Sequence, residues 1–287
     1  MKFTVISILK LGMLDYATGL RLQQKLLDLR KENRIGDVLL LLEHTPVITL
    51  GRNAKAVNII ASPDELSRRG VEVFECDRGG DVTFHGPGQL IGYPIFDLRA
   101  FPSSDGKRKT MGVIEYVRGL EELLIRTCAD FGIAAQRICG LTGVWTKDAA
   151  EPGLAGTLRL RSGQAREGAR PHTSEPAKIA AIGVHVSRSV TSHGFALNVN
   201  TDLDYFNLIV PCGITSKPVT SMAKELGNSV SISEVTTSVI RNFGVVFQNQ
   251  ILWLENLNAL LEGTVGVPMK PPAELRKLRN EQESFQA

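Results

Sequence analysis

The sequence predicts an α/β (α+β) domain. Strand-like runs and helical periodicities both occur along the 287 residues, and they follow one another without a regular βαβ alternation. Hydrophobic residues make up 43% of the chain and charged residues 22%, which is typical of a soluble globular protein. A chain of this length buries roughly three quarters of its unfolded surface, in one large domain or two small ones.

The first part of the chain contains both kinds of pattern. Residues 2–9 alternate as a strand does, and leucines recur at helical spacing over residues 15–31. Residues 38–42 form a short apolar run, which is typical of a strand buried on both faces. Ser62 precedes a proline and two acidic residues, a favourable helix start, and we expect this helix to end near Gly70. Further strands are expected at 47–50, 71–74 and 90–98.

The second part of the chain opens with the clearest amphipathic helix. Residues 110–130 place their apolar side chains on one side, and Gly132 ends the pattern. A serine at 231 or 233 is a suitable cap for a helix over residues 231–249. The remaining expectations are strands at 133–138, 143–146, 179–186 and 195–199, and a last helix at 252–261.

A change of composition separates residues 148–177 from their surroundings. This segment is rich in glycine, alanine, arginine, serine and proline, and it contains only three large apolar residues. Strand-like sequence resumes directly after it, so we interpret it as a weakly ordered inserted loop rather than a linker between domains. The expected organisation is a single domain over residues 1–265, followed by a polar tail over residues 266–287.

Charge and cysteine content exclude several classes of protein. The formal net charge of +3 is too small to indicate a nucleic-acid-binding protein. No apolar run is long enough to span a bilayer, and no signal peptide is recognisable, so no membrane association is expected. The four cysteines lack C-x-x-C spacing, which argues against a zinc ribbon and favours a reducing cytoplasm. Three of them are expected to be small buried hydrophobes: Cys76, Cys128 and Cys139.

Residues 78–94 are the most informative segment of the chain. They contain five glycines and two prolines beside Arg78, His85 and Gln89. Such a run forms a poor helix and a poor interior strand, whereas glycine lets the backbone come close to a ligand. We interpret the segment as a rigid substrate-binding loop. Two tight turns between ordinary strands are the alternative.

Three further positions are candidates for chemistry. Cys212 lies between a proline and a glycine on a predicted turn, where its sulfur either faces a cleft or is a buried structural thiol. Lys178 precedes small apolar residues, so its amine either reaches water or lies beside a reactive group. A lysine next to a cysteine stabilises the thiolate when charged and accepts a proton when neutral. His193 is expected at the lip of a sheet, and small residues such as Gly183 and Gly194 leave room for a slim acyl chain.

Four segments together resemble the lipoyl(octanoyl) transferase family of lipoate biosynthesis. They are residues 78–89, the Gly-Val-Trp strand at 143–145, residues 178–183 with 191–200, and Pro-Cys-Gly-Ile at 211–214. The resemblance extends from about residue 35 to about residue 225. It implies a catalytic domain of the biotin/lipoate protein ligase type, with a mixed sheet flanked by helices.

The resemblance also implies an activity and a site. Family members move an octanoyl group from octanoyl-acyl carrier protein to a lysine ε-amine on lipoyl domains of 2-oxoacid dehydrogenases and on the glycine cleavage H protein. A thioester is already activated, so no cofactor, ATP or metal is expected. The family assigns the thioester-forming nucleophile to Cys212 and its tuning partner to Lys178. Implied substrate contacts are Arg78, Gly79, Gly80, Asp81, Val82, Thr83, Phe84, His85, Ala181, Ile182, Gly183, Gly194, Phe195 and Ala196.

The chain departs from the family pattern in three places. The segment 148–177 is longer than the turn that family members usually have there, and we interpret it as a tolerated surface insertion. Asp81 stands where relatives often carry glutamine, and Phe84 where many carry tyrosine. Neither change affects the implied Cys212–Lys178 pair.

Three other functions remain open at this point. One is an ATP-dependent lipoate or biotin protein ligase on the same fold, which has no need of a cysteine at position 212. Another is a non-catalytic module that binds an acyl group or a lipoyl domain. The third is a cysteine hydrolase that pairs Cys212 with His85 or His193.

Overall fold

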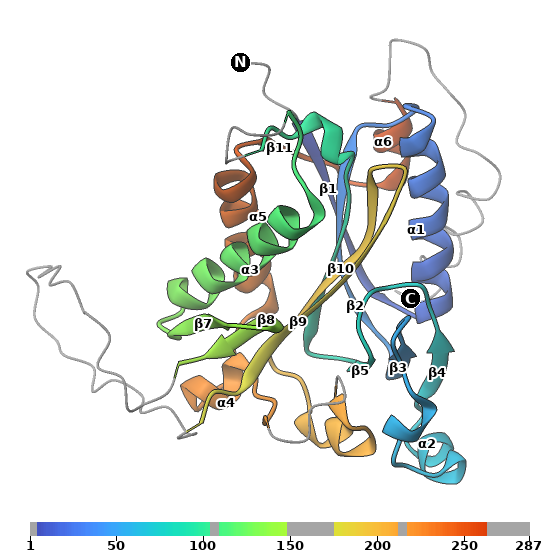
Figure 1. The fold of residues 1–287 in the computed structure, drawn as a ribbon, viewed down its shortest axis with the longest axis vertical. Coiled ribbons are helices and arrows are strands. Elements are labelled where there is room, and N and C mark those ends of the chain that lie inside the picture. The colour runs from blue at the N-terminus through green and yellow to red at the C-terminus, as the bar shows by residue number, and fades with distance from the viewer. Residues whose placement is uncertain (1–4, 104–108, 148–174, 212–216, 263–287) are drawn as a thin grey trace, which may run out of the picture.

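A computed structural model describes residues 5–103, 109–147, 175–211 and 217–262 of the chain. Within these residues an eight-stranded mixed sheet, in the order β11-β1-β2-β6-β10-β9-β8-β7, forms the centre of the molecule (Figure 1). A small sheet of three strands, in the order β4-β3-β5, lies beside it. The predicted mixed sheet flanked by helices is therefore confirmed.

The elements have the following bounds. The strands are β1 (Val5–Leu14), β2 (Asp37–His44), β3 (Val47–Leu50), β4 (Glu72–Glu75), β5 (Val82–His85), β6 (Gln89–Ile95), β7 (Ala135–Ile138), β8 (Leu141–Thr146), β9 (Lys178–Ser187), β10 (Val190–Asn198) and β11 (Gln250–Trp253). The α-helices are α1 (Tyr16–Lys31), α2 (Pro63–Arg68), α3 (Val113–Asp130), α4 (Met222–Leu226), α5 (Ile232–Phe247) and α6 (Leu257–Glu262). Short 3₁₀ helices are η1 (Ala56–Asn58), η2 (Leu98–Ala100) and η3 (Leu203–Leu208).

Helices cover both faces of the large sheet. Figure 1 shows α3 and α5 side by side on one face, with α1 and α6 on the other. Strand β2 serves both layers, because Leu39 and Leu41 pack with α3 and α5 whereas Val38, Leu40 and Leu42 pack with α1. This arrangement explains why the sequence of β2 is a continuous apolar run rather than an alternating one.

Most of the expected elements are present with small shifts of their ends. The leucine-rich segment 15–31 is α1, and residues 110–130 contain α3. Ser62 caps α2, because its hydroxyl accepts a hydrogen bond of 3.2 Å from the backbone N–H of Glu65. The expected insertion at 148–177, apart from residues 175–177, and the expected tail at 266–287 lie outside the described residues.

The glycine-rich run at 78–94 differs from its prediction. It contains two strands, β5 and β6, and β6 is buried and paired between β2 and β10. Gly92 is tolerated inside β6 because the ring of Phe195, on the paired strand β10, occupies the space that a Cβ would need. Only the residues on either side of β5 form loops, so the two-turn alternative describes this segment better.

Three other expectations were wrong in detail. His193 lies inside β10 rather than at its lip, because the β9–β10 turn is made by Arg188 and Ser189, both with positive φ. Residues 252–261 begin as β11, which pairs parallel to β1, and only then become helical. Of the three cysteines expected to be buried, Cys128 is buried, Cys76 is half-buried and Cys139 is exposed. Cys139 is exposed because it stands in the turn between β7 and β8.

A buried carboxylate joins α3 to the β7–β8 hairpin. Glu121 is fully buried and accepts hydrogen bonds from Arg118 at 2.6 Å, from Arg137 at 3.1 Å and from the backbone N–H of Gly143 at 3.2 Å. Its neighbour Glu122 also pairs with Arg137, at 2.9 Å, but its side chain is 35% exposed. Both glutamates therefore form ion pairs with arginine, but the Glu121 side chain is fully buried whereas the Glu122 side chain is partly exposed to water.

We expect Glu121→Ala to lower the free energy of unfolding by about 2 kcal/mol, because it removes charged hydrogen bonds and leaves a buried N–H without its acceptor. Glu122→Ala is the matched control, and it should cost less than about 1 kcal/mol because its ion pairs are exposed to water. Urea denaturation of both variants measures the difference. Equal losses in the two variants would contradict this account of the hairpin.

Candidate active site

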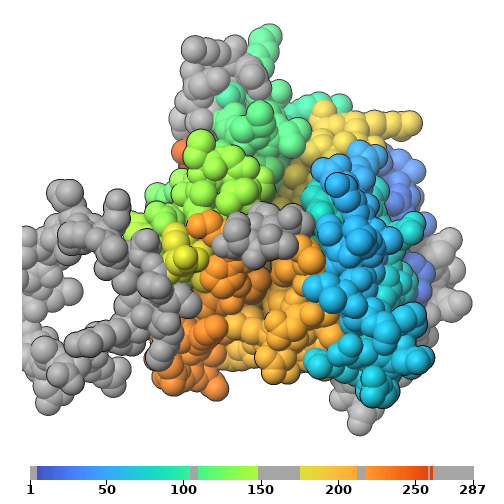
Figure 2. All heavy atoms as spheres, turned by 60° about the horizontal axis from the view of Figure 1, so that its bottom comes forward, coloured from blue at the N-terminus to red at the C-terminus, as the bar shows by residue number. Residues whose placement is uncertain are grey.

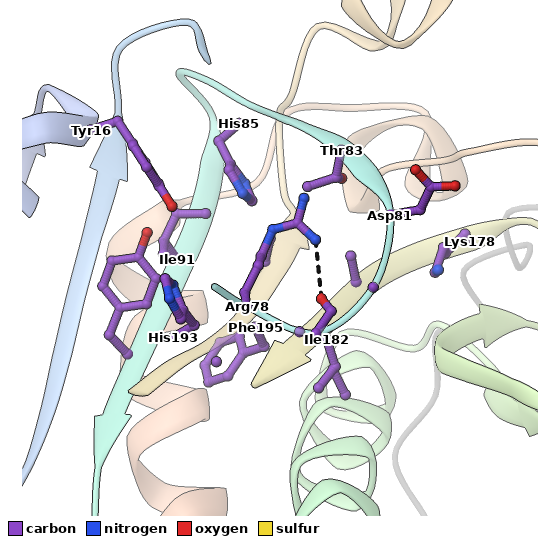
Figure 3. Close-up of a pocket in the computed structure, with 17 residues that line it drawn as sticks. Tyr16, Arg78, Asp81, Thr83, His85, Ile91, Lys178, Ile182, His193 and Phe195 are labelled. Atoms are coloured by element: carbon purple, nitrogen blue, oxygen red, sulfur yellow. Dashed lines mark hydrogen bonds between the residues drawn. The ribbon is translucent and has the colours of Figure 1, made fainter. Parts of the chain in front are cut away.

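A cavity opens between residues 78–83, β9, β10 and β6, with the start of α1 at one end (Figure 3). Most of the implied site residues line it: Arg78, Gly79, Gly80, Asp81, Thr83, His85, Lys178, Ala181, Ile182, Gly183, Gly194, Phe195 and Ala196. Four lining residues were outside the implied set: Tyr16, Ile91, Tyr93 and His193.

The roof of the cavity depends on two glycines. The backbone N–H of Gly79 donates a hydrogen bond of 3.1 Å to the carbonyl of Val184 in β9. A Cβ on Gly183 would lie only 2.7 Å from the carbonyl oxygen of Gly79. Any side chain at position 183 would therefore push the loop away from the strand.

Arg78 is clamped by the small sheet. Its guanidinium is buried and donates to the carbonyl of Thr49 at 2.7 Å, to the Thr49 hydroxyl at 2.9 and 3.1 Å, and to the carbonyl of Gly79 at 3.1 Å. These bonds fix one positive charge in the cavity wall between its two ends (Figure 3). The same bonds hold the loop to β3, so Arg78 also has a structural role.

Asp81 mainly anchors the loop. Its carboxylate accepts hydrogen bonds from the amide of Asn58 at 2.7 Å and from the backbone N–H of Val82 at 2.7 Å. A third, longer bond of 3.3 Å comes from the backbone N–H of Lys55. Asp81 lines the cavity, but its side chain fastens the glycine loop to η1.

Two residues of the implied set do not line the cavity. Successive residues of β5 face opposite sides, so Thr83 and His85 line the cavity whereas Val82 and Phe84 face the other way. Phe84 stacks on Tyr205 with ring centroids 4.7 Å apart, inside the small core. Position 84, where this chain has phenylalanine and many family members have tyrosine, therefore lies away from the cavity.

His85 is held as a neutral acceptor by a buried network. Its Nδ1 donates to the Gln89 side-chain oxygen at 2.7 Å, and the Gln89 amide donates to the carbonyl of Phe84 and to Asn198. Asn198 in turn donates to the carbonyl of Thr220 at 2.9 Å. A backbone carbonyl can only accept a hydrogen bond, so the side-chain nitrogens of Gln89 and Asn198 must be the donors. The side-chain oxygen of Gln89 then accepts the proton of Nδ1 of His85, and Nε2 of the neutral ring carries no proton. Burial lowers the pKa of His85 to about 3.

A second buried histidine supports the wall from outside. Nδ1 of His44 donates to the carbonyl of Leu14 at 2.9 Å, so its Nε2 accepts from the hydroxyl of Tyr93 at 2.7 Å. Burial lowers the pKa of His44 to about 4. Neither His44 nor Tyr93 stood out in the sequence, because each is a single residue at a distant position on a different strand.

His193 holds the chain that leads into the glycine loop. Its Nε2 donates to Asp77 at 2.7 Å, and this bond is the main reason that the pKa of Asp77 is lowered to about 2. His193 also takes a positive φ of 55°, and its backbone N–H donates to Gln23 at 2.9 Å. The sequence left a structural and a functional role open for His193. The structure shows a structural contact, made by a residue that also lines the cavity.

Lys178 stands at the other end of the cavity. Its backbone is fixed by hydrogen bonds with the carbonyl of Pro218, at 2.8 Å, and with the N–H of Thr220, at 2.9 Å. Its amine lies 5.1 Å from the ring centre of Trp145, within range of a cation–π contact. Gly143 gives the side chain room, because a Cβ there would lie 2.8 Å from Cε of Lys178.

The predicted nucleophile, Cys212, lies outside the described residues. Pro211, the residue directly before it, lines a smaller cavity together with Thr83, Lys178 and Asn198. In the described part of the chain, no three His, Cys, Asp or Glu side chains are arranged to bind a metal. The described helices include none with the length and apolar character of a membrane span.

The two neutral histidines predict a loss of stability in mild acid. His44 and His85 have pKa values of about 4 and 3 in the folded chain, below the ordinary value of 6.5. Between pH 6.5 and pH 4 the unfolded chain binds protons that the folded chain does not, so the free energy of unfolding falls as the pH falls. Each histidine contributes a slope of about 1.4 kcal/mol per pH unit.

Urea denaturation between pH 7 and pH 4.5 tests this expectation. The variants His44→Gln and His85→Gln should each reduce the slope of the unfolding free energy against pH by about 1.4 kcal/mol per pH unit, which corresponds to one proton. This holds whatever the stability of each variant at pH 7. A slope that is the same in both variants and in the original chain would show that these rings are already charged in the fold.

Comparisons with known proteins agree with this geometry. The family profile described as lipoyl protein ligase A/B catalytic domain matches residues 15–244. The octanoyltransferase of Koribacter versatilis is 56% identical over 278 residues, which cover 96% of this chain and 98% of the relative. The octanoyltransferase of Acidobacterium capsulatum is 52% identical over 259 residues, or 90% of this chain and 96% of the relative.

Solved structures share the fold at low sequence identity. The bi-partite lipoate protein ligase of Thermoplasma acidophilum superimposes with a TM-score of 0.63 at 16% identity, over 98% of this chain and 92% of the other. Lipoate-protein ligase A bound with ATP gives a TM-score of 0.60 at 15% identity, over 98% and 94% of the two chains. From the profile match and these relatives, the chain belongs to the lipoyl protein ligase A/B catalytic domain family, and within it to the octanoyltransferases.

Proposed function

We propose that the chain takes its octanoyl group from octanoyl-acyl carrier protein and holds it as a thioester on Cys212. It then passes the group to a lysine ε-amine on lipoyl domains of 2-oxoacid dehydrogenases and on the glycine cleavage H protein. One observation carries the proposal. Lys178 lines both the main cavity and the smaller one, whose wall includes Pro211, the residue bonded to Cys212.

The main cavity suits a slim apolar chain over its middle section. Ile91, Ala181, Ile182, Phe195 and Ala196 contribute apolar surface there. Arg78 lies in the same wall, but its hydrogen bonds go to the protein backbone and to Thr49. An acyl chain bound here gains stability from removing its methylenes from water.

The first step forms the covalent intermediate. The Cys212 thiolate attacks the carbonyl carbon of the donor thioester, the bond from that carbon to the carrier's sulfur breaks, and the carrier leaves as a thiolate that takes a proton from water. The new bond is again a thioester, so the acyl group stays activated and the step needs no nucleotide. A charged amine on Lys178 favours the thiolate over the thiol.

The second step transfers the acyl group to the acceptor. The neutral acceptor amine attacks the Cys212 thioester, the carbon–sulfur bond breaks, and the amide forms as the thiolate returns. The attacking nitrogen must lose a proton, and a neutral Lys178 amine is the base we assign to it. The names of the relatives support the octanoyl group, and the name of the family supports lipoyl-bearing acceptors.

Intact-mass measurement after mixing with octanoyl-acyl carrier protein tests the intermediate. We expect one octanoyl group per chain, labile to hydroxylamine, and none on Cys212→Ala, because a thioester needs the sulfur. Cys139→Ala is the matched control, since Cys139 is an exposed thiol that the proposal does not use. Acylation of the Cys212 variant, or a requirement for ATP, would overturn the proposal.

Single-turnover kinetics of the two steps test the role of Lys178. Lys178→Arg keeps the positive charge but cannot act as a base, since an arginine remains protonated. We expect acylation of Cys212 to survive in this variant and transfer to the acceptor amine to slow at least about 100-fold. Lys147→Arg, an exposed lysine beyond β8, should change neither step. Transfer that is as fast in Lys178→Arg as in the original chain would leave Lys178 with the charge effect alone and would contradict its role as the base.

A further inference from the structure

The main cavity and the smaller cavity beside Pro211 share part of their walls. Four residues line both of them: Thr83, Lys178, Ala181 and Ala196. Two of the four are alanines. Among the described residues, Thr83 and Lys178 therefore bring the only polar side chains to the junction of the two cavities.

The side chain of Thr83 faces this junction. Successive residues of β5 alternate, so Thr83 points away from the small core that contains Val82 and Phe84. The residue is 7% exposed, and its hydroxyl makes no hydrogen bond to the described residues, although it is not sealed off among them either. In Figure 3 Thr83 lies between His85 and Lys178. The hydroxyl therefore opens onto the cavities, where a bound molecule can accept a hydrogen bond from it.

The reacting carbonyl group belongs at the same junction. In the proposed function the acyl chain occupies the main cavity, and Cys212 is bonded to Pro211 in the wall of the smaller one. The carbon that joins chain and sulfur then lies where the two cavities meet. Figure 2 shows the start of β9, in yellow, beside the orange segment that contains α4, so this end of the site lies close to the protein surface.

We propose that the hydroxyl of Thr83 donates a hydrogen bond to the octanoyl carbonyl oxygen as that oxygen becomes negatively charged. The inference rests on the proposed function and adds a catalytic residue to it. In both steps the nucleophile adds to the carbonyl carbon, the electron pair of the C=O bond moves to the oxygen, and the pair returns as the carbon–sulfur bond breaks. The hydroxyl keeps its proton throughout, so it stabilises the tetrahedral intermediate without changing the proton balance.

The roles of Thr83 and Lys178 differ by step. The amine of Lys178 is charged when it favours the thiolate and neutral when it acts as the base. A neutral hydroxyl is a donor in both steps, whatever the charge of the lysine. Loss of the Thr83 hydroxyl should therefore slow acylation and transfer alike, whereas Lys178→Arg should slow transfer alone.

Thr83→Val replaces the hydroxyl with a methyl group and keeps the branched shape of the side chain. In single-turnover experiments with octanoyl-acyl carrier protein and a lipoyl domain, we expect both steps to slow about 100-fold, the usual effect of removing one oxyanion donor. Thr83→Ser retains the hydroxyl and should recover most of the lost rate. Thr236→Val is the matched control and should change neither step. Thr236 is also buried, but its hydroxyl donates to the carbonyl of Ile232 within α5 and it lines neither cavity.

Binding and pH dependence separate this role from a structural one. In a Cys212→Ala background, which cannot react, Thr83→Val should leave the Kd for octanoyl-acyl carrier protein nearly unchanged, because the donor acts on the charged oxygen of the intermediate. Octanal adds to a thiol as a tetrahedral hemithioacetal, so its inhibition should weaken at least about tenfold in Thr83→Val. The acylation rate should fall by the same factor at every pH with an unchanged midpoint, because Thr83 does not titrate in this range.

Circular dichroism identifies a variant that does not fold, and Thr83→Ala, which also lacks the hydroxyl, then takes the place of Thr83→Val. A folded variant without the hydroxyl that acylates and transfers at the original rates overturns the inference and leaves the proposed function intact. Slowing of one step alone, or a shifted pH midpoint with an unchanged maximum rate, overturns the inference as well. Failure of the original chain to become acylated on Cys212 overturns the proposed function itself.

Discussion

The close approach of the glycine loop to β9 is the constraint on which the site depends. Gly79 donates to the carbonyl of Val184, and Gly183 offers no side chain to hold the two backbones apart. This contact brings Arg78 and its neighbours over the sheet, where they roof the cavity. The small sheet and the large sheet meet through this loop, so the cavity exists only where both are folded.

Buried hydrogen bonds then fix the walls without help from a ligand. Arg78 is bound to Thr49, and His85 is oriented by Gln89 through a network that ends at a backbone carbonyl. His193 is bound to Asp77. Because these polar groups are already satisfied, the site is preorganised and its histidines at 44 and 85 stay neutral near pH 7.

The segments that resemble the family converge around Lys178. The Gly-Val-Trp strand shapes the space for its side chain through Gly143 and Trp145. The backbone of Lys178 is fixed by residues 218 and 220, which follow the Pro-Cys-Gly-Ile segment in the chain. The buried Glu121 supports the same strand from α3 through its bond to Gly143. Sequence motifs far apart in the chain thus describe one end of one cavity.

The sequence by itself determined the class of fold, most of the elements and the family, because those follow from local periodicity, caps and short motifs. It predicted that the strand at residues 38–42 is buried on both faces, and most of the residues it implied for the site do line the cavity. It did not determine which face of β5 meets the cavity, so Val82 and Phe84 were assigned with Thr83 and His85. The tertiary structure decided this, and it also added Tyr16, Ile91 and Tyr93 to the cavity wall. Which way a short strand faces, and which distant helix meets it, depends on long-range packing that no local pattern records.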